Sequence, residues 1–130
     1  TILNNLAALG VGELHPVGFC GEDGEGFELR RALSEMRGVN LRHFLTTPLR
    51  RTFTYCKPLV LEPGKPPREL NRLDSKNWTP TPAAIADQLT HSVAELRAAT
   101  DAMIVMDQVD AAGTGVVSEQ FLGLLRAEGG

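Results

Sequence analysis

The spacing of the apolar residues changes repeatedly along this chain, and this change constrains the fold more than any other feature. Residues 29–36 and 85–96 carry apolar side chains at the three- and four-residue steps of a helix. Residues 17–20 and 102–106 are instead short apolar runs, as in buried parallel strands. Parallel strands need a crossover, usually a helix, between them. The alternation therefore predicts an α/β fold with a Rossmann-like parallel sheet flanked by helices.

Local signals mark the start of the later helices. Thr81 is expected to cap the helix over residues 85–96 through its side chain, with Pro82 at the first helical position. Trp78, which lies between a polar stretch and this cap, is expected to pack as an apolar anchor under the helix. A closing helix is expected over residues 117–124.

The middle of the chain has a different character. Residues 51–61 are rich in β-branched, aromatic and aliphatic side chains and predict a strand, with an edge or a bulge at Pro58 because proline has no N–H for a ladder. Residues 62–67 predict a turn, and residues 68–74 a return strand. Together with the strand-like run just before it, this portion predicts an antiparallel β-lid over residues 41–74, inserted into the α/β fold.

The composition excludes several classes of partner. With 13 Lys+Arg against 16 Asp+Glu, the formal net charge is -3, which argues against a general affinity for nucleic acid or anionic lipid. The apolar runs are far shorter than the roughly 20 residues that a membrane-spanning helix needs. The two cysteines lack a CxxC spacing and fit reduced thiols. We therefore expect a cytoplasmic protein that binds neither nucleic acid nor membrane.

Familiar cofactor and catalytic motifs are missing. The glycine-rich residues 21–26 follow a predicted strand and precede a predicted helix, but they have neither the dinucleotide-binding nor the P-loop spacing. Their acidic side chains would repel a phosphate, so we interpret them as a turn that favours a helix N-terminus. The three histidines and two cysteines share no metal-ligand spacing, and no serine lies in a nucleophile motif. Neither a metal site nor a nucleophilic enzyme is expected.

A few polar and aromatic residues remain as candidates for ligand contact. Asp107, followed by Gln108, falls where the second apolar strand ends, and open α/β sheets bind ligands beyond the carboxyl ends of their strands. The alternative is a carboxylate that serves its own loop or a helix cap. Strand alternation places Tyr55 and Lys57 on one face of the predicted lid, and Arg72 is a similar cation. This face either covers an anionic substrate or is a solvated or partner-packed surface.

Several short motifs follow one another in a fixed order. They are Asn-Leu-Ala-Ala-Leu-Gly at residues 5–10, Val-Gly-Phe-Cys-Gly-Glu-Asp-Gly-Glu-Gly at residues 17–26, and then Leu29, Leu33 and Gly38-Val39. In this order and spacing they resemble the N-terminal, sugar-side half of the ribokinase-like (PfkB) carbohydrate kinases. The continuation is Arg-Thr-Phe-Thr-Tyr-Cys-Lys at residues 51–57, Arg-Leu-Asp at residues 72–74 and the apolar run that ends at Asp107. It is most similar to the branch that phosphorylates heptose 7-phosphate in ADP-heptose synthesis.

The resemblance implies a β-lid over a sugar and phosphoryl transfer from ATP, with Mg2+, to a sugar hydroxyl. A glycine pair that contacts the sugar in this family is expected just before Thr1, and a Gly-Ala-Gly-Asp motif with the catalytic aspartate is expected beyond Gly130. Residues 1–130 are therefore expected to form one partial carbohydrate-kinase domain without a catalytic residue. We expect the longer enzyme to use ATP and Mg2+, and this chain alone to bind neither well and to be inactive.

The resemblance also implies a site for a sugar or a sugar phosphate. Carried over position by position, its residues are Thr1, Asn5, Tyr55, Lys57, Arg72, Asp107 and Gln108. Lys57 and Arg72 would hold a sugar phosphate, and the last two residues a sugar hydroxyl. Thr1 stands where many members have asparagine, and Tyr55 stands where a lid lysine is common.

The partner implied for the lid is a second copy of the chain, so we expect a homodimer through the β-lid. The alternative function is a non-enzymatic interaction or dimerisation module that uses the edge of this lid to pair with another chain.

Overall fold

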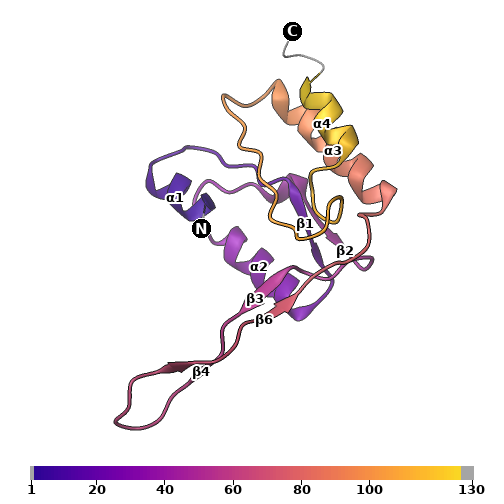
Figure 1. Cartoon of the computed structure of the whole chain (residues 1–130). Helices are drawn as coiled ribbons and strands as arrows, with labels where there is room; N and C mark the ends of the chain where they lie inside the picture. The colour runs from indigo at the N-terminus through magenta and orange to yellow at the C-terminus, as the bar shows by residue number, and fades with distance from the viewer. Residues whose placement is uncertain (1, 127–130) are drawn as a thin grey trace.

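The computed structural model describes residues 2–126. They form a mixed α/β fold with four α-helices, one two-stranded parallel sheet and two two-stranded antiparallel sheets (Figure 1). The helices are α1 (Ile2–Ala8), α2 (Gly24–Ser34), α3 (Ala83–Arg97) and α4 (Glu119–Arg126). The strands are β1 (Gly18–Gly21), β2 (Phe44–Thr47), β3 (Thr54–Cys56), β4 (Leu59–Val60), β5 (Arg68–Glu69) and β6 (Leu73–Ser75), and a 3₁₀ turn, η1 (Leu41–His43), precedes β2. None of the helices in this range is long and apolar enough to cross a membrane.

A helix connects two parallel strands, as predicted, but the second strand is β2, which the sequence placed in the lid, rather than residues 102–106. The two strands pair in parallel, with Gly18 opposite Phe44, and α2 packs against β1. An isolated parallel bridge between Leu14 and Val39 extends the pairing toward the amino ends of the strands. The parallel arrangement follows from the connection, because a helix between two strands returns the chain to the same end of the sheet.

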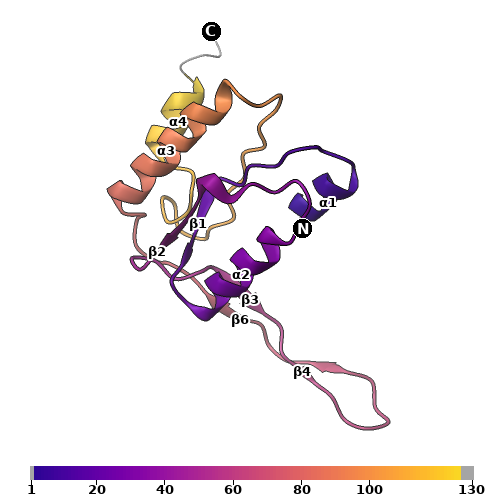
Figure 2. The ribbon, with the colours of Figure 1, turned by 180° about the vertical axis from the view of Figure 1, so that it is seen from behind.

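The main apolar core involves α3. Leu89 and Val93 of this helix are 0% and 1% exposed, and Phe121 of α4 is 4% exposed. The two α3 residues were predicted to share a face because positions four apart lie above one another on a helix. α3 and α4 pack together, and in both views the parallel pair lies between them and α2 (Figures 1 and 2).

The start of α3 differs from the prediction. The helix begins at Ala83 with Pro82 as N-cap, and no side chain caps it. The Thr81 hydroxyl donates instead to the carbonyl of Gly115 at 2.7 Å, and the Thr81 amide donates to that of Gly113 at 2.8 Å. The predicted capping role of Thr81 is therefore wrong, because the loop before α4 accepts both of its donors.

Trp78 is not the predicted apolar anchor either. Its side chain is 68% exposed, and the ammonium of Lys76 lies 5.9 Å from its ring centroid. The ring therefore contacts a cation at the surface rather than lying under the helix, a second use to which the amphipathic indole is suited.

Residues 54–75, which we call the flap, form the two antiparallel sheets. β3 pairs with β6 near the body of the molecule and β4 with β5 farther out, so the flap projects as an arm (Figure 1). β3 and β4 are separated at Pro58, and the pairing register shifts by one residue across this break. The predicted irregularity at this proline is confirmed, and its cause is the missing N–H.

The flap is shorter than the lid predicted over residues 41–74. Residues 41–47 form η1 and β2, and β2 pairs in parallel with β1 rather than with a flap strand. β-Branched and aromatic residues favour a strand without specifying its neighbour. The sequence pattern therefore placed a strand of the parallel sheet in the lid.

The strand predicted over residues 102–106 does not form, and this prediction is wrong. Its four large apolar side chains, from Met103 to Met106, are between 36% and 60% exposed. Within residues 2–126 no strand pairs with this segment. An apolar run shows that a segment favours burial but not which strand lies beside it, and without a neighbouring strand there is no ladder.

Candidate functional site

A depression of about 370 Å3 opens beyond the carboxyl ends of β1 and β2. Its walls are residues 22–23, which follow β1, residues 48–51, which follow β2, and Asn77, which follows the flap. Ligands of open α/β sheets bind at this edge, outside the carboxyl ends of the strands. This depression is therefore one candidate site, and a group of polar side chains on the flap is a second.

Asp23 holds the two strand ends of the site together. Its carboxylate accepts hydrogen bonds from the Gly26 amide at 2.8 Å, the Thr52 amide at 2.9 Å and the Thr52 hydroxyl at 2.6 Å. Asp23 is thereby the N-cap of α2, and the Thr52 hydroxyl oxygen in turn accepts the Gly21 amide at 2.9 Å. Burial raises the pKa of the Asp23 carboxyl, but these hydrogen bonds outweigh it and leave the pKa below its ordinary value.

Asn77 connects the end of the flap to the segment after β2. Its side-chain amide donates to the Arg51 carbonyl at 2.8 Å, and its side-chain oxygen accepts from the Arg51 amide at 3.2 Å. The Arg51 guanidinium is 64% exposed and lies 3.8 Å from the Glu25 carboxylate. An exposed cation therefore stands at the rim of the depression.

The flap carries a second polar group of side chains on β3 and around β6. Tyr55 lies opposite Asp74 in this strand pair, and the Arg72 guanidinium lies 4.7 Å from the Tyr55 ring centroid, within the range of a cation–π contact. Arg72 also forms an ion pair with Asp74 at 2.7 Å. Lys76 Nζ lies 3.1 Å from Asp74 and 5.6 Å from the Tyr55 ring centroid.

The charges of this group stabilise one another. A hydrogen bond with Asp74, and its negative charge, raise the pKa of Arg72, and hydrogen bonds with Asp110 and Asp74 raise the pKa of Lys76. Burial raises the pKa of Asp74, but hydrogen bonds from Arg72 and Lys76 outweigh it, so that pKa lies below its ordinary value. Arg72, Asp74 and Lys76 are therefore ionised at neutral pH.

Lys57 follows β3 and belongs to the same strand face as Tyr55 by alternation. Its ammonium lies 3.3 Å from the Glu69 carboxylate, and the two side chains are 60% and 54% exposed. This cation therefore has one partner within the flap and is otherwise open to water.

Asp107 and Gln108 lie in the exposed loop that leads to α4. The Asp107 carboxylate accepts the Val117 amide at 3.4 Å and lies so close to Gly115 that a side chain at position 115 would have to displace it. Asp107 therefore shapes its own loop, which is one of the two roles that the sequence left open.

The structure brings together only some of the residues predicted for the site. Tyr55 and Arg72 are in contact, whereas Asn5 is an exposed residue of α1, a helix that lies apart from the flap in both views (Figures 1 and 2). Thr1 lies outside the described residues.

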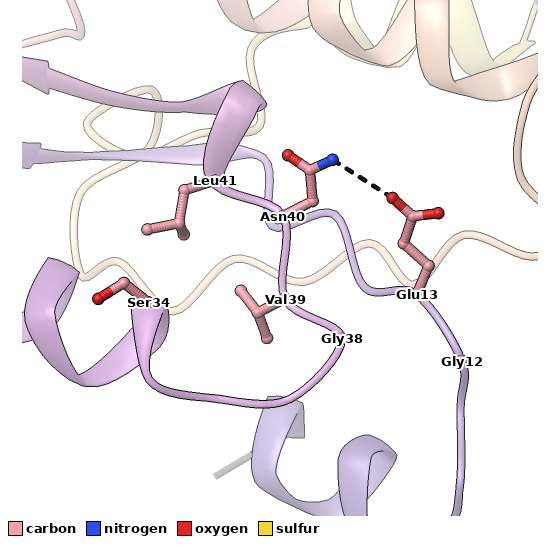
Figure 3. A pocket seen from close by; sticks show the side chains of 7 residues that line it. All are labelled: Gly12, Glu13, Ser34, Gly38, Val39, Asn40 and Leu41. Carbon is pink, nitrogen blue, oxygen red and sulfur yellow. Dashed lines mark hydrogen bonds between the residues drawn. The ribbon is translucent and has the colours of Figure 1, made fainter.

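A larger depression, of about 590 Å3, lies at the opposite edge of the parallel pair (Figure 3). It is lined by Ser34 and by residues 12–13 and 38–41, in the loops that lead into β1 and β2. Its polar side chains Glu13 and Asn40 bind each other at 3.3 Å, as Figure 3 shows. No lysine or arginine lines it, and it lies at the amino ends of the strands, so we do not assign ligand binding to it.

The histidines gather near α3. The rings of His15 and His43 are 6.2 Å apart, and the Glu95 carboxylate lies 3.9 Å from His43 Nε2 and 3.0 Å from His91 Nε2. Burial and the charge of Arg42 lower the pKa of His43. Nevertheless, nowhere in residues 2–126 do His, Cys, Asp or Glu side chains form a group able to hold a metal ion.

Sequence reasoning missed Lys76, Asn77 and the bond between Asp23 and Thr52. For Lys76 a signal was present, because the alternation that grouped Tyr55 with Lys57 also places residues 72, 74 and 76 on one strand face. For the other residues no local signal exists, since each bond joins segments distant in the sequence.

Comparisons of the chain with protein-family models, with curated proteins and with solved structures found no match. A functional proposal therefore rests on the chemistry of the site and on the motif resemblance.

Proposed function

We propose that this chain supplies the sugar-recognition part of an ATP-dependent carbohydrate kinase of the ribokinase-like (PfkB) family. The observation that supports it best is the cluster of Tyr55 and Arg72 on the flap with Lys76 just after it, linked by an ion pair to the loop that carries Asp107. An aromatic face, fixed cations and a carboxylate are suited to a phosphorylated sugar, because they match its apolar ring face, its phosphate and its hydroxyls.

Arg72 is the residue that we assign to the phosphate. Its guanidinium has five N–H donors and uses Nε and one terminal nitrogen on Asp74, which leaves further donors for a ligand on a side chain that is 51% exposed. Lys57 adds a second positive charge on the flap. Two cations favour a sugar phosphate over a neutral sugar.

Tyr55 and Asp107 are assigned to the sugar itself. The Tyr55 ring is 49% exposed and offers an apolar face to the C–H groups of a sugar ring. Asp107 accepts hydrogen bonds from hydroxyls, and Gln108, which is also exposed, both donates and accepts them. Thr1 and Asn5 enter the proposed site through the resemblance alone.

The finer features of the proposal also come from the resemblance. The parallel pair belongs to a Rossmann-like sheet, the flap is the β-lid, the substrate is heptose 7-phosphate, and ATP with Mg2+ is the phosphoryl donor in the cytoplasm. The Gly-Ala-Gly-Asp motif that carries the catalytic aspartate in this family is not among the 130 residues. We therefore expect no phosphoryl transfer by this chain alone.

A second candidate function is a non-enzymatic pairing module, and one observation favours it. Leu59, Leu61 and Leu73 of the flap are 54%, 73% and 62% exposed, and within residues 2–126 each flap sheet has only two strands, so its outer edges are unpaired. Free edges and exposed apolar side chains are means by which a sheet pairs with another chain. In this case the flap joins two copies of the chain. It is either the dimer contact of the kinase or the part of a non-enzymatic protein that carries out its function.

Calorimetric titration separates the two functions. The chain is titrated with heptose 7-phosphate, with the unphosphorylated heptose and with inorganic phosphate. We expect saturable binding of the sugar phosphate, and a loss of affinity of about tenfold or more in Arg72→Ala, since a charge-assisted hydrogen bond is removed.

Arg68→Ala is the matched control, because it removes the same charge from an exposed position of β5. Equal affinity in wild type and Arg72→Ala would contradict the assignment of Arg72. Absence of binding in the wild type, with a dimer that Leu61→Asp dissociates, would favour the pairing module instead.

A further inference from the structure

We propose that Lys76 is a positioning residue that couples the flap to the loop before α4 and thereby fixes the distance between the two halves of the site. Its role in ligand binding rests on the proposed function. The coupling itself does not, because it is measurable without any ligand.

The Lys76 ammonium contacts two carboxylates at once. Its Nζ lies 3.1 Å from Asp74 Oδ2 and donates a hydrogen bond to Asp110 Oδ2. Asp74 belongs to β6, whereas Asp110 lies 34 residues beyond Lys76 in the sequence. We call these three residues the Lys76 bridge, since they join two segments that are distant along the chain.

The flap side of the bridge is less exposed to water than its loop side. The side chains of Lys76 and Asp74 are 14% and 19% exposed, whereas that of Asp110 is 55% exposed. The rings of Tyr55 and Trp78 lie 5.6 and 5.9 Å from the ammonium. Solvent screens a pair of this kind less than a fully exposed pair, so its loss should weaken the contact between flap and loop more.

The other ion pairs of the flap do not reach the loop. Arg72 pairs with Asp74, Lys57 with Glu69 and Lys65 with Glu62, all within residues 54–75. These pairs order the arm internally. The Lys76 bridge differs from them because one of its carboxylates belongs to the body of the molecule.

The bridge adjoins both of the proposed ligand contacts. Asp74 also accepts a hydrogen bond from the Arg72 guanidinium at 2.8 Å, and Asp110 follows Asp107 in the same loop. The Lys76 ammonium therefore fixes the position of Arg72, which is assigned to the phosphate, relative to that of Asp107, which is assigned to a sugar hydroxyl. Such a residue contributes to affinity by pre-organising the site rather than by touching the ligand.

Hydrogen–deuterium exchange of the chain without ligand tests the coupling. The variants are Lys76→Met, which removes the charge from a similar stem, Asp110→Asn, which weakens the loop end, and Lys76→Arg, which keeps a charged donor. We expect Lys76→Met and Asp110→Asn to accelerate exchange by about fivefold in β3, in β6 and in residues 107–117, as for the loss of one such contact. Lys76→Arg should restore protection.

Lys65→Met is the matched control, because it removes the same charge from a pair at the tip of the flap. Its effect should stay at that tip. Trp78 is the single tryptophan of the chain, so its fluorescence reports the bridge directly, and its emission should shift in Lys76→Met but not in the control. Unchanged exchange in the loop, or equal effects of the two lysine variants there, would overturn the coupling.

The affinity for heptose 7-phosphate is a separate measurement. We expect Lys76→Met to weaken binding by about fivefold and Lys76→Arg to restore it. If Lys76→Met accelerates exchange but the wild type does not bind heptose 7-phosphate, the proposed function is wrong and the coupling stands. If Lys76→Met accelerates exchange but binds heptose 7-phosphate as tightly as the wild type, the proposed function stands and the positioning role of Lys76 is wrong.

Discussion

The body of the molecule and the flap are held together by different forces. In the body, Leu89 and Val93 of α3 are 0% and 1% exposed, and α4 packs on this helix. In the flap, Leu59 and Leu73 are 54% and 62% exposed, and the strands meet through ladders of two or three residue pairs and through surface ion pairs. Buried apolar area contributes far more to stability than exposed ion pairs do.

This difference separates stability from recognition. An isolated two-stranded sheet is at best marginally stable in water, so the flap depends on contacts at its base. Those contacts are the Asn77–Arg51 hydrogen bonds and the Lys76 bridge, and each adjoins a candidate site. The Lys76 bridge therefore both orders the flap and adjoins the residues assigned to the ligand.

The largest expected effect is the loss of a core side chain. Leu89→Ala should lower the free energy of unfolding by about 2–5 kcal/mol, because it removes buried methyl groups and leaves a cavity. Urea denaturation followed by circular dichroism gives the value. Leu59→Ala is the control, since the same truncation at a side chain that is 54% exposed should cost well under 1 kcal/mol. Equal losses of unfolding free energy in the two variants would show that side-chain packing stabilises the flap as much as the body.

The next largest effect is expected at Asp23, which joins the start of α2 to the segment that leads into the flap. Asp23→Ala removes the acceptor for the Thr52 hydroxyl and for the Gly26 and Thr52 amides, and it removes the N-cap of α2. We expect a loss of about 1–3 kcal/mol in the free energy of unfolding. Asp101→Ala removes a carboxylate from an exposed turn and serves as the control. A loss at Asp23 no larger than at Asp101 would contradict its structural role.

The sequence predicted the helices and the flap better than the strand pairing of the body, for a physical reason. Helical spacing over residues 85–96 predicted α3, and the two strand-like runs on either side of the turn at residues 62–67 predicted the antiparallel flap, because periodicity and turn residues are local properties. The sequence did not specify how the strands of the body pair. It did not predict that β2 leaves the lid or that residues 102–106 stay exposed and without a ladder. Both depend on which segment lies alongside, and residue type alone does not specify it.

The site shows the same limit. Strand alternation grouped Tyr55 with Lys57 and drew attention to Arg72, and the structure places Tyr55 and Arg72 in contact. The partners of Asp23 and Lys76 were not predictable, because their hydrogen bonds join residues about 30 positions apart. Whether these side chains bind a sugar phosphate stays a prediction that the titration tests.

A change of pH should weaken the body before it affects the flap. Burial and the positive charge of Arg42 lower the pKa of His43, against the opposing charge of Glu95, while His15 and His91 add small lowering effects. The unfolded chain therefore binds this proton more readily than the folded one. Stability from His43 is complete above its ordinary pKa of 6.5 and falls as the pH drops below it, by at most about 1.4 kcal/mol per pH unit for one group.

Urea denaturation between pH 7 and pH 5 measures this dependence. In His43→Gln the slope over this range should decrease, whereas His91→Gln should retain it, because the His91 side chain is 76% exposed. The Arg72, Asp74 and Lys76 group stays ionised in this range, since the pKa of Asp74 is lowered and those of the two cations are raised. If the exchange protection of β3 and β6 fell together with that of α3 as the pH is lowered, the proposed contrast between flap and body would be wrong.

The smallest expected effect lies within the flap. Lys57→Met breaks the pair with Glu69, whose two side chains are 60% and 54% exposed, so we expect the free energy of unfolding to change by less than about 1 kcal/mol. A double-mutant cycle with Glu69→Gln isolates the pair energy, and about 1 M salt should abolish it, because the screening length is then only about 3 Å. If the coupling energy is unchanged in such salt, the Lys57–Glu69 pair is shielded from water within the flap, and the exposure of its side chains does not determine its strength. If the coupling is instead small and salt-sensitive, the arm contributes almost nothing to folding, and any large loss of sugar-phosphate affinity in Lys57→Met would have to come from the missing charge.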